Sequence, residues 1–373
     1  MEVRRNIEEL QSLRGLAALN VVISHVSTVY TLPPNIRLTI DFLFNAHSSI
    51  VIFFVLSGYV LAGSLTRRRA NNTSYASYYV ARAFRLLPAL WAASFISLML
   101  IYIFPPTAIY PVASSWFLGY IHGVPSLTIG LLCFFGLSNW LLMPVWTVFI
   151  EFLGSSLMPF MVVFALRYSR CFSLLLVALG LVSFPTAHLP HRLNIFAYLF
   201  EFAVGIQLAS YDFGRKRKYH SAWVSVSAGA LLFFRPLWFF FMTGSAKPLT
   251  YGYEDPLPML VEGLAAAALI GLIVGGYGRS SVLSNRVAVR LGNISYSLYL
   301  LHFPIAILAT KLLSQMYREP IGTSAATAIL LLATISASLF FATIQYHCIE
   351  IPMNNFGRSL FPRRSAERRA VIS

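Results

Sequence analysis

The chain contains a series of apolar runs of about 20 residues each, long enough for a helix to cross a bilayer core about 30 Å thick. Hydrophobic residues make up 57% of the 373 residues and charged residues only 11%, whereas about a quarter of an average soluble domain is charged. This composition excludes a disordered chain, a coiled coil and an ordinary soluble enzyme. We therefore predict an all-α, polytopic integral membrane protein folded as a helical bundle.

Ten of these runs are separated by polar breaks and are predicted to be transmembrane helices. Their approximate ranges are 14–32, 47–66, 84–105, 145–166, 171–188, 194–212, 220–242, 257–278, 291–313 and 323–346. A further apolar stretch, 116–137, is interrupted by Pro125 and by glycines. We expect it to enter and leave on the outer side without crossing, because an odd number of spans would reverse the orientation of everything that follows.

The basic residues predict how the chain is oriented. The net charge is +15, and with a cytoplasmic N-terminus about 22 of the 28 Lys and Arg residues fall on the inner side, as the positive-inside rule requires. They include Arg67 to Arg69, the run Arg215 to Lys218 and arginines after residue 357. Both termini are therefore predicted to be cytoplasmic, with one membrane domain at 1–352 and a short basic tail at 353–373. The scattered basic residues favour contact with membrane lipid and disfavour a nucleic-acid partner.

Ionisable residues inside a span cost about 2.5–3.5 kcal/mol each on insertion scales, and they usually face an interior cavity. Arg14 and His25 are three helical turns apart in the first span, so they share one face and are separated by roughly 16 Å along the axis. Arg14 alone could anchor the helix at the headgroups, and His25 alone could serve helix packing. As a pair on one face they favour a common cavity, in which a neutral imidazole is suited to act as a general base.

Glu151 in the fourth span is expected at about the depth of His25. From there its carboxylate could orient the imidazole and stabilise the protonated ring during a reaction, as in a catalytic triad. Glu201 in the sixth span lies at a similar depth and is the alternative. Glu151 could instead form an ion pair with another span. We favour Glu151.

His302 lies near the middle of the ninth span, just before Pro304. It is either a second base, a substrate-binding residue or a packing residue.

Arg82 and Arg85 precede the third span at i and i+3 and so share a face. They could anchor to lipid headgroups or form an anion site, because guanidinium groups bind phosphates bidentately and coenzyme A carries a diphosphate and a 3′-phosphate. Arg14 would lie on the same, cytoplasmic side of the membrane.

Five segments, in this order along the chain, resemble the motifs of membrane acyltransferase family 3. They are Leu13–Ala18 with the following His25, Phe53–Val60, Arg82–Arg85, Val145–Glu151 and Ser295–Pro304. Each motif alone is weak evidence, but all five in order, from about residue 8 to residue 350, make the resemblance specific. The chain departs from the family pattern at Val51, where many members have an acidic residue, and at Phe152, where many have a second glutamate.

The resemblance implies a bacterial inner-membrane enzyme that moves an acyl group, usually acetyl, from cytoplasmic acyl-CoA to a sugar hydroxyl. The acceptor is often an exopolysaccharide, a lipopolysaccharide or a lipid-linked sugar. The resemblance implies catalytic roles for His25 and Arg14 and an acyl-CoA-binding role for Arg82 and Arg85, with Arg14. Acyl-CoA is then a co-substrate, and no permanently bound cofactor or metal is expected. The other expected substrate contacts, all in the matching motifs, are His302, Tyr59 and Trp146.

Two functions of other classes stay open at the level of the sequence. One is a transporter or flippase of a lipid-linked sugar, and the other is a non-catalytic partner in a polysaccharide-synthesis complex. A flippase does not need coenzyme A, so the pair Arg82 and Arg85 favours the enzyme. The sequence does not distinguish direct attack by the acceptor hydroxyl from an acyl-histidine intermediate on His25.

Overall fold

The computed structural model describes residues 2–71, 73–104, 113–187, 195–211, 222–244, 255–275, 283–316 and 324–361. All regular structure in these ranges is helical, and β-pairing among them is limited to an isolated bridge between Tyr30 and Ala113. The predicted all-α membrane bundle is therefore confirmed.

Seven segments of the described chain are long and apolar enough to cross a membrane. They are formed by α1 (Glu2–Val29), α2 (Pro34–Leu43) with α3 (Ala46–Ala70), α4 (Tyr75–Ile103), α7 (Val145–Arg167), α10 (Ala222–Thr243), α11 (Pro256–Val274), and α14 (Ser324–Gln345) continued by a π-helical turn (Tyr346–Glu350) and α15 (Ile351–Ser359). An eighth span results if α12 (Arg286–Asn293) and α13 (Ser295–Met316), which are bent by 68° at their junction, are counted together.

The expected fifth and sixth spans are present as shorter helices. They are α8 (Ser169–Ser183) and α9 (Ile195–Ala209), each of 15 residues. At 1.5 Å per residue such a helix is about 22 Å long, which is less than the core of a typical bilayer. The structure thus supports seven or eight full spans where the sequence predicted ten, because the apolar runs at these two places include residues that are not part of the helices.

Two further expectations concern the apolar stretch 116–137 and the C-terminal tail. The stretch 116–137 forms only two short helices, α5 (Ser115–Leu118) and α6 (Leu127–Phe134), and neither is long enough to cross. The chain is still helical beyond residue 353, where the tail was expected to begin, and α15 ends at Ser359. The rest of the expected tail, 362–373, lies outside the described residues.

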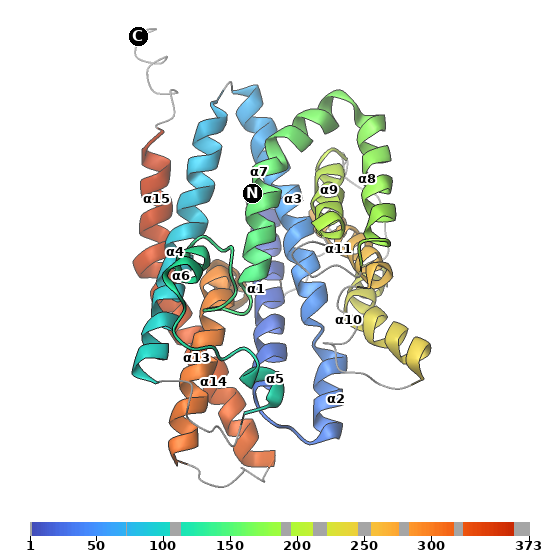
Figure 1. Ribbon diagram of the computed structural model, residues 1–373. Helices are drawn as coiled ribbons and strands as arrows, with labels where there is room; N and C mark the ends of the chain where they lie inside the picture. Colours follow the sequence, from blue (N-terminus) through green and yellow to red (C-terminus); the bar gives the residue numbers. More distant parts are fainter. Residues whose placement is uncertain are drawn as a thin grey trace.

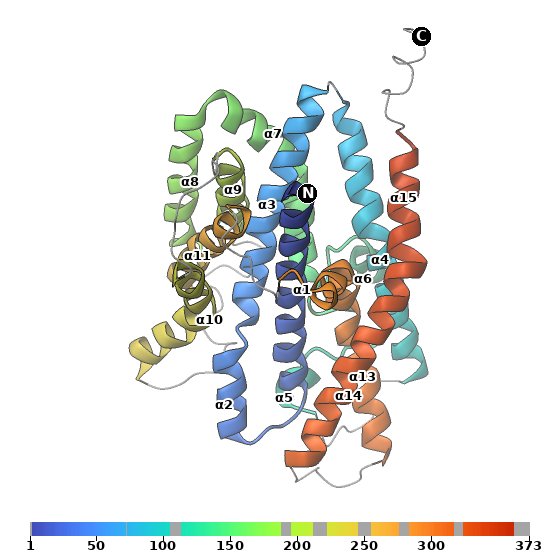
Figure 2. The same cartoon turned by 180° about the vertical axis from the view of Figure 1, so that it is seen from behind.

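The helices run mostly along one direction, and α1 lies in the interior of the bundle, packed against α3, α12 and α13 (Figures 1 and 2). The C-terminal ends of α3, α7 and α15 reach the upper end in Figure 1. These ends carry Arg67, Arg68 and Arg69, then Arg167, and then Arg358. We call this the basic end. The positive-inside rule predicts that it is cytoplasmic. The run Arg215 to Lys218 lies outside the described residues.

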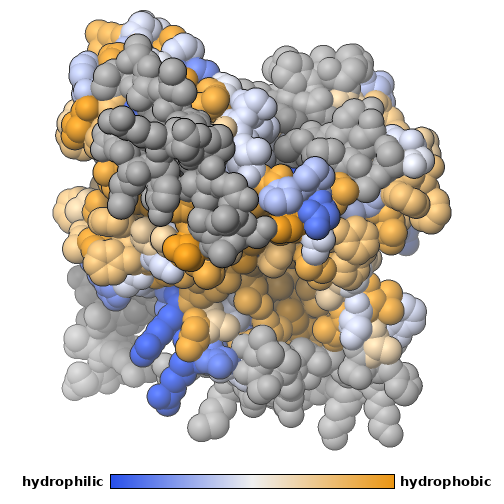
Figure 3. All heavy atoms as spheres, turned by 90° about the horizontal axis from the view of Figure 1, so that it is seen from below, coloured by the Kyte–Doolittle hydropathy of each residue, from blue (hydrophilic) through white to orange (hydrophobic). Residues whose placement is uncertain are grey.

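The surface of the bundle is suited to lipid. Figure 3 looks at the end opposite the basic end, where hydrophobic residues are prominent among the described residues; the sides of the bundle are not seen in this view. Large apolar side chains such as Phe95, Phe160 and Leu174 are more than half exposed. In water such a surface would drive aggregation, whereas in a bilayer it contacts lipid chains.

Glycines in the motif segments allow helices to approach closely. A Cβ atom on Gly58 of α3 would lie 2.3 Å from the carbonyl oxygen of Phe202 in α9, and one on Gly205 would lie 2.1 Å from that of Val55. Both contacts are with backbone, which cannot move aside as a side chain can. Gly58 and Gly205 therefore set the distance between α3 and α9, as small residues do at helix interfaces in membranes.

Substitution of Gly58 is accordingly expected to destabilise the protein. Gly58→Val should lower the free energy of unfolding by about 1–3 kcal/mol or more, because overpacking forces the two backbones apart. The matched control is Gly229→Ala in α10, where an added Cβ has no neighbour within 4 Å. Thermal unfolding in detergent should show a lower Tm for Gly58→Val and an unchanged Tm for the control. An unchanged Tm for both would contradict the close packing.

Candidate active site

Two histidines from distant parts of the sequence meet in the centre of the bundle. Nδ1 of His25 in α1 lies 2.9 Å from Nε2 of His302 in α13, and the two rings are stacked with centroids 5.2 Å apart. His302 is only 1% exposed, and His25 is half-buried. The bend between α12 and α13 turns α13 against α1, so that the two rings face each other.

The contacts of His302 decide which nitrogen of His25 is basic. Nδ1 of His302 lies 3.3 Å from the carbonyl oxygen of Leu298, which can only accept a hydrogen bond. A neutral His302 therefore carries its proton on Nδ1 and accepts at Nε2. The donor must then be Nδ1 of His25, which leaves the lone pair of His25 on Nε2. In this arrangement His302 orients the His25 ring and holds it in the tautomer that a general base needs.

The His25 ring also lies near aromatic residues. The ring of Trp116, at α5, lies 6.2 Å from that of His25, and Tyr120 lies 5.1 Å from Trp116. Both belong to the segment that was expected to enter and leave on the outer side. Their rings offer a flat surface with polar edges beside the histidine pair.

A large cavity opens at the basic end and extends into the bundle, with a volume of about 2260 Å³. Most of its lining comes from α1, α3, α4, α7, α13 and α15, and α9 and α11 contribute Ala209 and Val274. Its charged lining consists of Arg14, Arg67, Arg68, Arg82, Arg85, Glu151 and Arg358. The three arginines expected to bind an acyl donor, Arg14, Arg82 and Arg85, thus face one space although they come from two helices.

Arg14 and Arg85 are available to bind an anion. The structure gives neither of them a hydrogen-bond partner within the described part of the chain, and both line the cavity. Buried guanidinium groups without partners are costly, so such groups are normally found where a ligand or water supplies the acceptors. Nearby negative charge comes from Glu350, which interacts electrostatically with both arginines.

Glu151 lies with the arginines. Its carboxylate forms an ion pair with Arg82 and accepts a hydrogen bond of 3.1 Å from Ser57. Arg82 is held further by Ser155, at 2.6 Å from Nη2. The expected contact between Glu151 and the His25 imidazole is not formed, and His302 occupies the position of the orienting group. Similar depth in the membrane did not place the two side chains together, because depth says nothing about the direction in which a helix face points.

The remaining expected site residues have different surroundings. Tyr59 lines the cavity. Trp146 does not line it and packs against Tyr198 at 5.5 Å, so its place is in the hydrophobic core. Glu201, the alternative carboxylate, is fully buried against Gly263 and also lies outside the cavity lining.

Glu350 is a candidate that sequence reasoning missed. It ends the π-helical turn, and its Oε1 accepts hydrogen bonds from the backbone nitrogen of Ser297 at 2.9 Å and from Oγ of Ser297 at 2.5 Å. It therefore ties the last span to α13 next to Arg14 and Arg85. The signal was a carboxylate at the end of the last apolar run, in a chain that has only 13 acidic residues. π-Helical turns are rare and are often found at functional sites.

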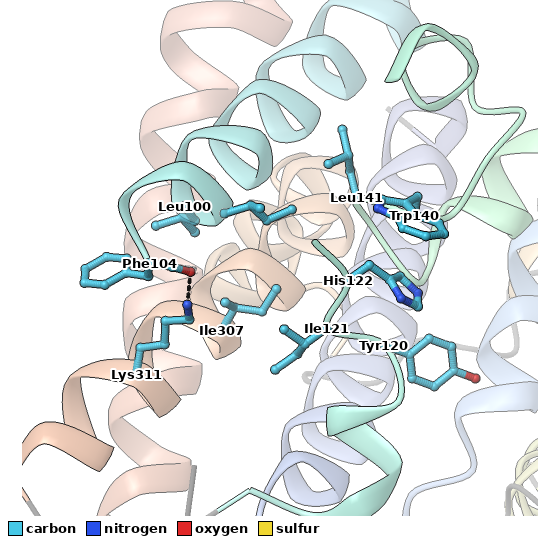
Figure 4. A pocket seen from close by; sticks show the side chains of 10 residues that line it. Leu100, Phe104, Tyr120, Ile121, His122, Trp140, Leu141, Ile307 and Lys311 are labelled. Atoms are coloured by element: carbon cyan, nitrogen blue, oxygen red, sulfur yellow. Dashed lines mark hydrogen bonds between the residues drawn. The ribbon is translucent and has the colours of Figure 1, made fainter. Parts of the chain in front are cut away.

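A second, much smaller pocket lies between α4, α13 and residues 120–122 (Figure 4). Lys311 points across it and donates a hydrogen bond to the carbonyl of Phe104, and His122 stacks on Trp140 with ring centroids 4.4 Å apart. Its volume of about 10 Å³ has room for about one water molecule. This pocket is too small for a substrate, so the large cavity is the candidate donor site.

Comparison with known protein families agrees with the resemblance seen in the sequence. The model of the acyltransferase 3 family, described as an acyltransferase domain, matches residues 7–343. The chain belongs to the acyltransferase 3 family. No curated protein and no solved structure matches the chain. The match covers nearly the whole length of this multi-pass membrane protein. It includes both histidines and most of the residues that line the large cavity, whereas the lining residues of and after α15 lie beyond residue 343.

Proposed function

We propose that this acyltransferase moves an acyl group, acetyl in the first instance, from acyl-CoA bound in the large cavity to a sugar hydroxyl, with His25 as general base. The observation that carries the proposal is the arrangement of a deep, arginine-lined cavity that leads from the basic end toward the histidine pair. The acceptor is proposed to be a hydroxyl of an exopolysaccharide, a lipopolysaccharide or a lipid-linked sugar at the bacterial inner membrane.

The cavity fits a donor that is long and negatively charged at one end. Its volume of about 2260 Å³ exceeds that of pockets for drug-sized ligands, about 300–1000 Å³. Arg82 and Arg85 supply guanidinium groups for the phosphates near the basic end, and Arg14 supplies another deeper inside. The roughly 16 Å along α1 from Arg14 to His25 suits an extended arm that carries a thioester inward.

The histidine pair supplies the base. Nε2 of His25 takes the proton of the acceptor hydroxyl, the oxygen attacks the thioester carbonyl, and the carbon–sulfur bond breaks to release coenzyme A as a thiolate. His25 then transfers this proton to the thiolate, which leaves as the free thiol of coenzyme A. His302 accepts the hydrogen bond from Nδ1 of His25 throughout and keeps the ring in place. Glu151 acts through Arg82, whose position it fixes.

A covalent variant of this reaction uses the same lone pair. Nε2 of His25 would attack the thioester first, and the acyl-imidazole would then pass the acyl group to the acceptor. Incubation with donor alone followed by intact-protein mass spectrometry separates the two. A mass increase that requires His25 supports the covalent route, and an unmodified protein under turnover conditions supports direct transfer.

The acceptor is proposed to approach from the side opposite the arginines. This is supported by the aromatic rings beside His25, because Trp116 lies 6.2 Å from the His25 ring and Tyr120 lies 5.1 Å from Trp116. An aromatic ring pairs well with the apolar face of a sugar, while its polar edge stays solvated. The donor and the acceptor would thus reach the base from opposite ends, which allows transfer across the membrane without movement of the glycan.

The proposal is tested with purified protein in proteoliposomes. With acetyl-CoA and a lipid-linked glycan from the producing cell, we expect release of the coenzyme A thiol together with labelled acetyl on the glycan. Movement of the lipid-linked sugar across the bilayer without thiol release would establish the flippase instead. Neither activity from a folded protein would favour a non-catalytic partner.

A further inference from the structure

We propose that Phe53, Thr147 and Tyr299 form a fixed barrier between the donor cavity and the histidine pair, and that this barrier restricts the acyl group to a chain of two or three carbons. The inference rests on the proposed function, because it concerns how the acyl end of the donor reaches His25. It names residues and a chain-length limit that the family membership does not supply.

The three side chains lie where the cavity ends. Phe53, Thr147 and Tyr299 all line it, whereas His25 and His302 do not. The ring of Tyr299 lies 5.9 Å from that of His302, and the ring of Phe53 lies 6.2 Å from that of Tyr299 in an edge-on arrangement. Tyr299 therefore lies next to both the cavity and His302, with Phe53 and Thr147 beside it, and we call these three side chains the layer.

Hydrogen bonds hold Tyr299 in this layer. Its hydroxyl lies 2.6 Å from Oγ1 of Thr147 and 3.2 Å from the carbonyl oxygen of Pro144, and Oγ1 of Thr147 lies 3.0 Å from the same carbonyl oxygen. Each hydroxyl has one proton, so one of the two donates to the other and the second donates to the carbonyl. Rotation of the Tyr299 ring out of the layer would break these bonds in a place where little water can replace them.

Packing holds Phe53. It contacts three of the hydrophobic clusters that make up the interior of the protein. It lies on α3, whose position is set by the glycine contact with α9. An aromatic ring at such a junction cannot move without opening space in several directions.

The fixed layer limits the size of the acyl group. The thioester carbonyl stops beside Tyr299, where a hydroxyl held by His25 has to reach it, and the acyl chain has to fit among the same side chains. An acetyl group adds one methyl beyond the carbonyl, whereas a hexanoyl group adds four more methylenes. In a packed pocket each methylene changes selectivity by about 10-fold or more.

The test compares acetyl-, butyryl- and hexanoyl-CoA as donors, with kcat/KM measured for each in the full-length protein. We expect the wild type to prefer acetyl over butyryl by about 10-fold or more and acetyl over hexanoyl by about 100-fold or more. Phe53→Ala should reduce this preference by about 10-fold or more, because it opens the layer. Tyr299→Phe keeps the ring and removes its hydrogen bonds, so it should reduce the preference by a smaller factor.

Two control variants lie in the same cavity but away from its end. Tyr296 is one turn before Tyr299 and donates to the carbonyl of Leu86, so Tyr296→Phe removes a comparable hydroxyl. Leu56 is one turn after Phe53 on α3, so Leu56→Ala makes comparable space. Both should keep the wild-type ratio of acetyl to hexanoyl transfer.

The outcomes show whether this inference fails alone or together with the proposed function. A wild type that uses hexanoyl-CoA as well as acetyl-CoA overturns the barrier and leaves acyl transfer standing. The same holds if Phe53→Ala and Tyr299→Phe are folded, by their Tm, and keep the wild-type ratio. If no acyl-CoA is consumed by the wild type in the presence of acceptor, the proposed function and the barrier are both overturned.

Discussion

Replacement of His25 by alanine is expected to lower kcat/KM for acyl transfer by about 100-fold to 10,000-fold, the range typical of general acid–base catalysis. The reason is that His25 carries the lone pair that faces away from His302. Among the described residues, His302 is the only other imidazole that contacts His25, so no other histidine can replace it. The measurement is acyl-CoA-dependent labelling of the acceptor by purified protein. His122→Ala, in a half-buried segment outside the large cavity, is the matched control and should retain full activity.

Two substitutions of His302 test whether it orients the His25 ring. His302→Ala removes the acceptor for Nδ1 of His25, so the ring loses its orientation and its fixed tautomer. His302→Gln offers an amide oxygen in about the same place and should restore part of the activity. A purely structural role for His302 predicts that both variants lose stability together and that the glutamine does not rescue kcat. For the His25 prediction above, full transfer activity in a folded His25→Ala variant would contradict general-base catalysis by His25.

Replacement of Arg85 by glutamine is expected to raise KM for acyl-CoA by about 10-fold or more with little change in kcat. The loss of one hydrogen bond to a charged group costs about 1.5–3 kcal/mol, and the phosphates of the donor are bound equally in the ground state and the transition state. Arg85 is a cleaner test than Arg82, because Arg82 also forms the ion pair with Glu151.

The control for Arg85 is a basic residue of the same end. Arg167 lies in the last turn of α7, stacked over Tyr168 at 5.5 Å, and does not line the cavity. Arg167→Gln removes one positive charge from the basic end without touching the proposed phosphate site. An equal rise of KM in both variants would mean that the general charge of the surface, and not the cavity, attracts the donor.

Much of the framework could be predicted from the apolar runs and the basic residues. The runs placed helices where the structure has them, and the spacing of Arg82 and Arg85, together with the position of Arg14, placed three arginines on one side. The lengths of α8 and α9 could not be predicted, because an apolar run does not show where a helix within it ends. Nor does a run show that two helices, such as α12 and α13, will bend at their junction.

The site was predicted less completely, and the reason is geometric. His25 and His302 are 277 positions apart, and their contact depends on which faces of α1 and α13 meet. The depth of Glu151 suggested a contact with His25, but its helix turns that side chain toward Arg82. Sequence spacing fixes neighbours within one helix and leaves contacts between helices to the packing of the whole bundle.

The central claim is that acyl-CoA binds from the basic end with its acyl group directed at His25. The most direct measurement is a structure of the protein with bound acetyl-CoA, in the inactive His25→Ala form. We predict phosphate density within hydrogen-bonding distance of Arg82, Arg85 or Arg14, and the thioester beside Tyr299. Donor density at the opposite end, near Trp116, or phosphates without contact to any of the three arginines, would contradict it.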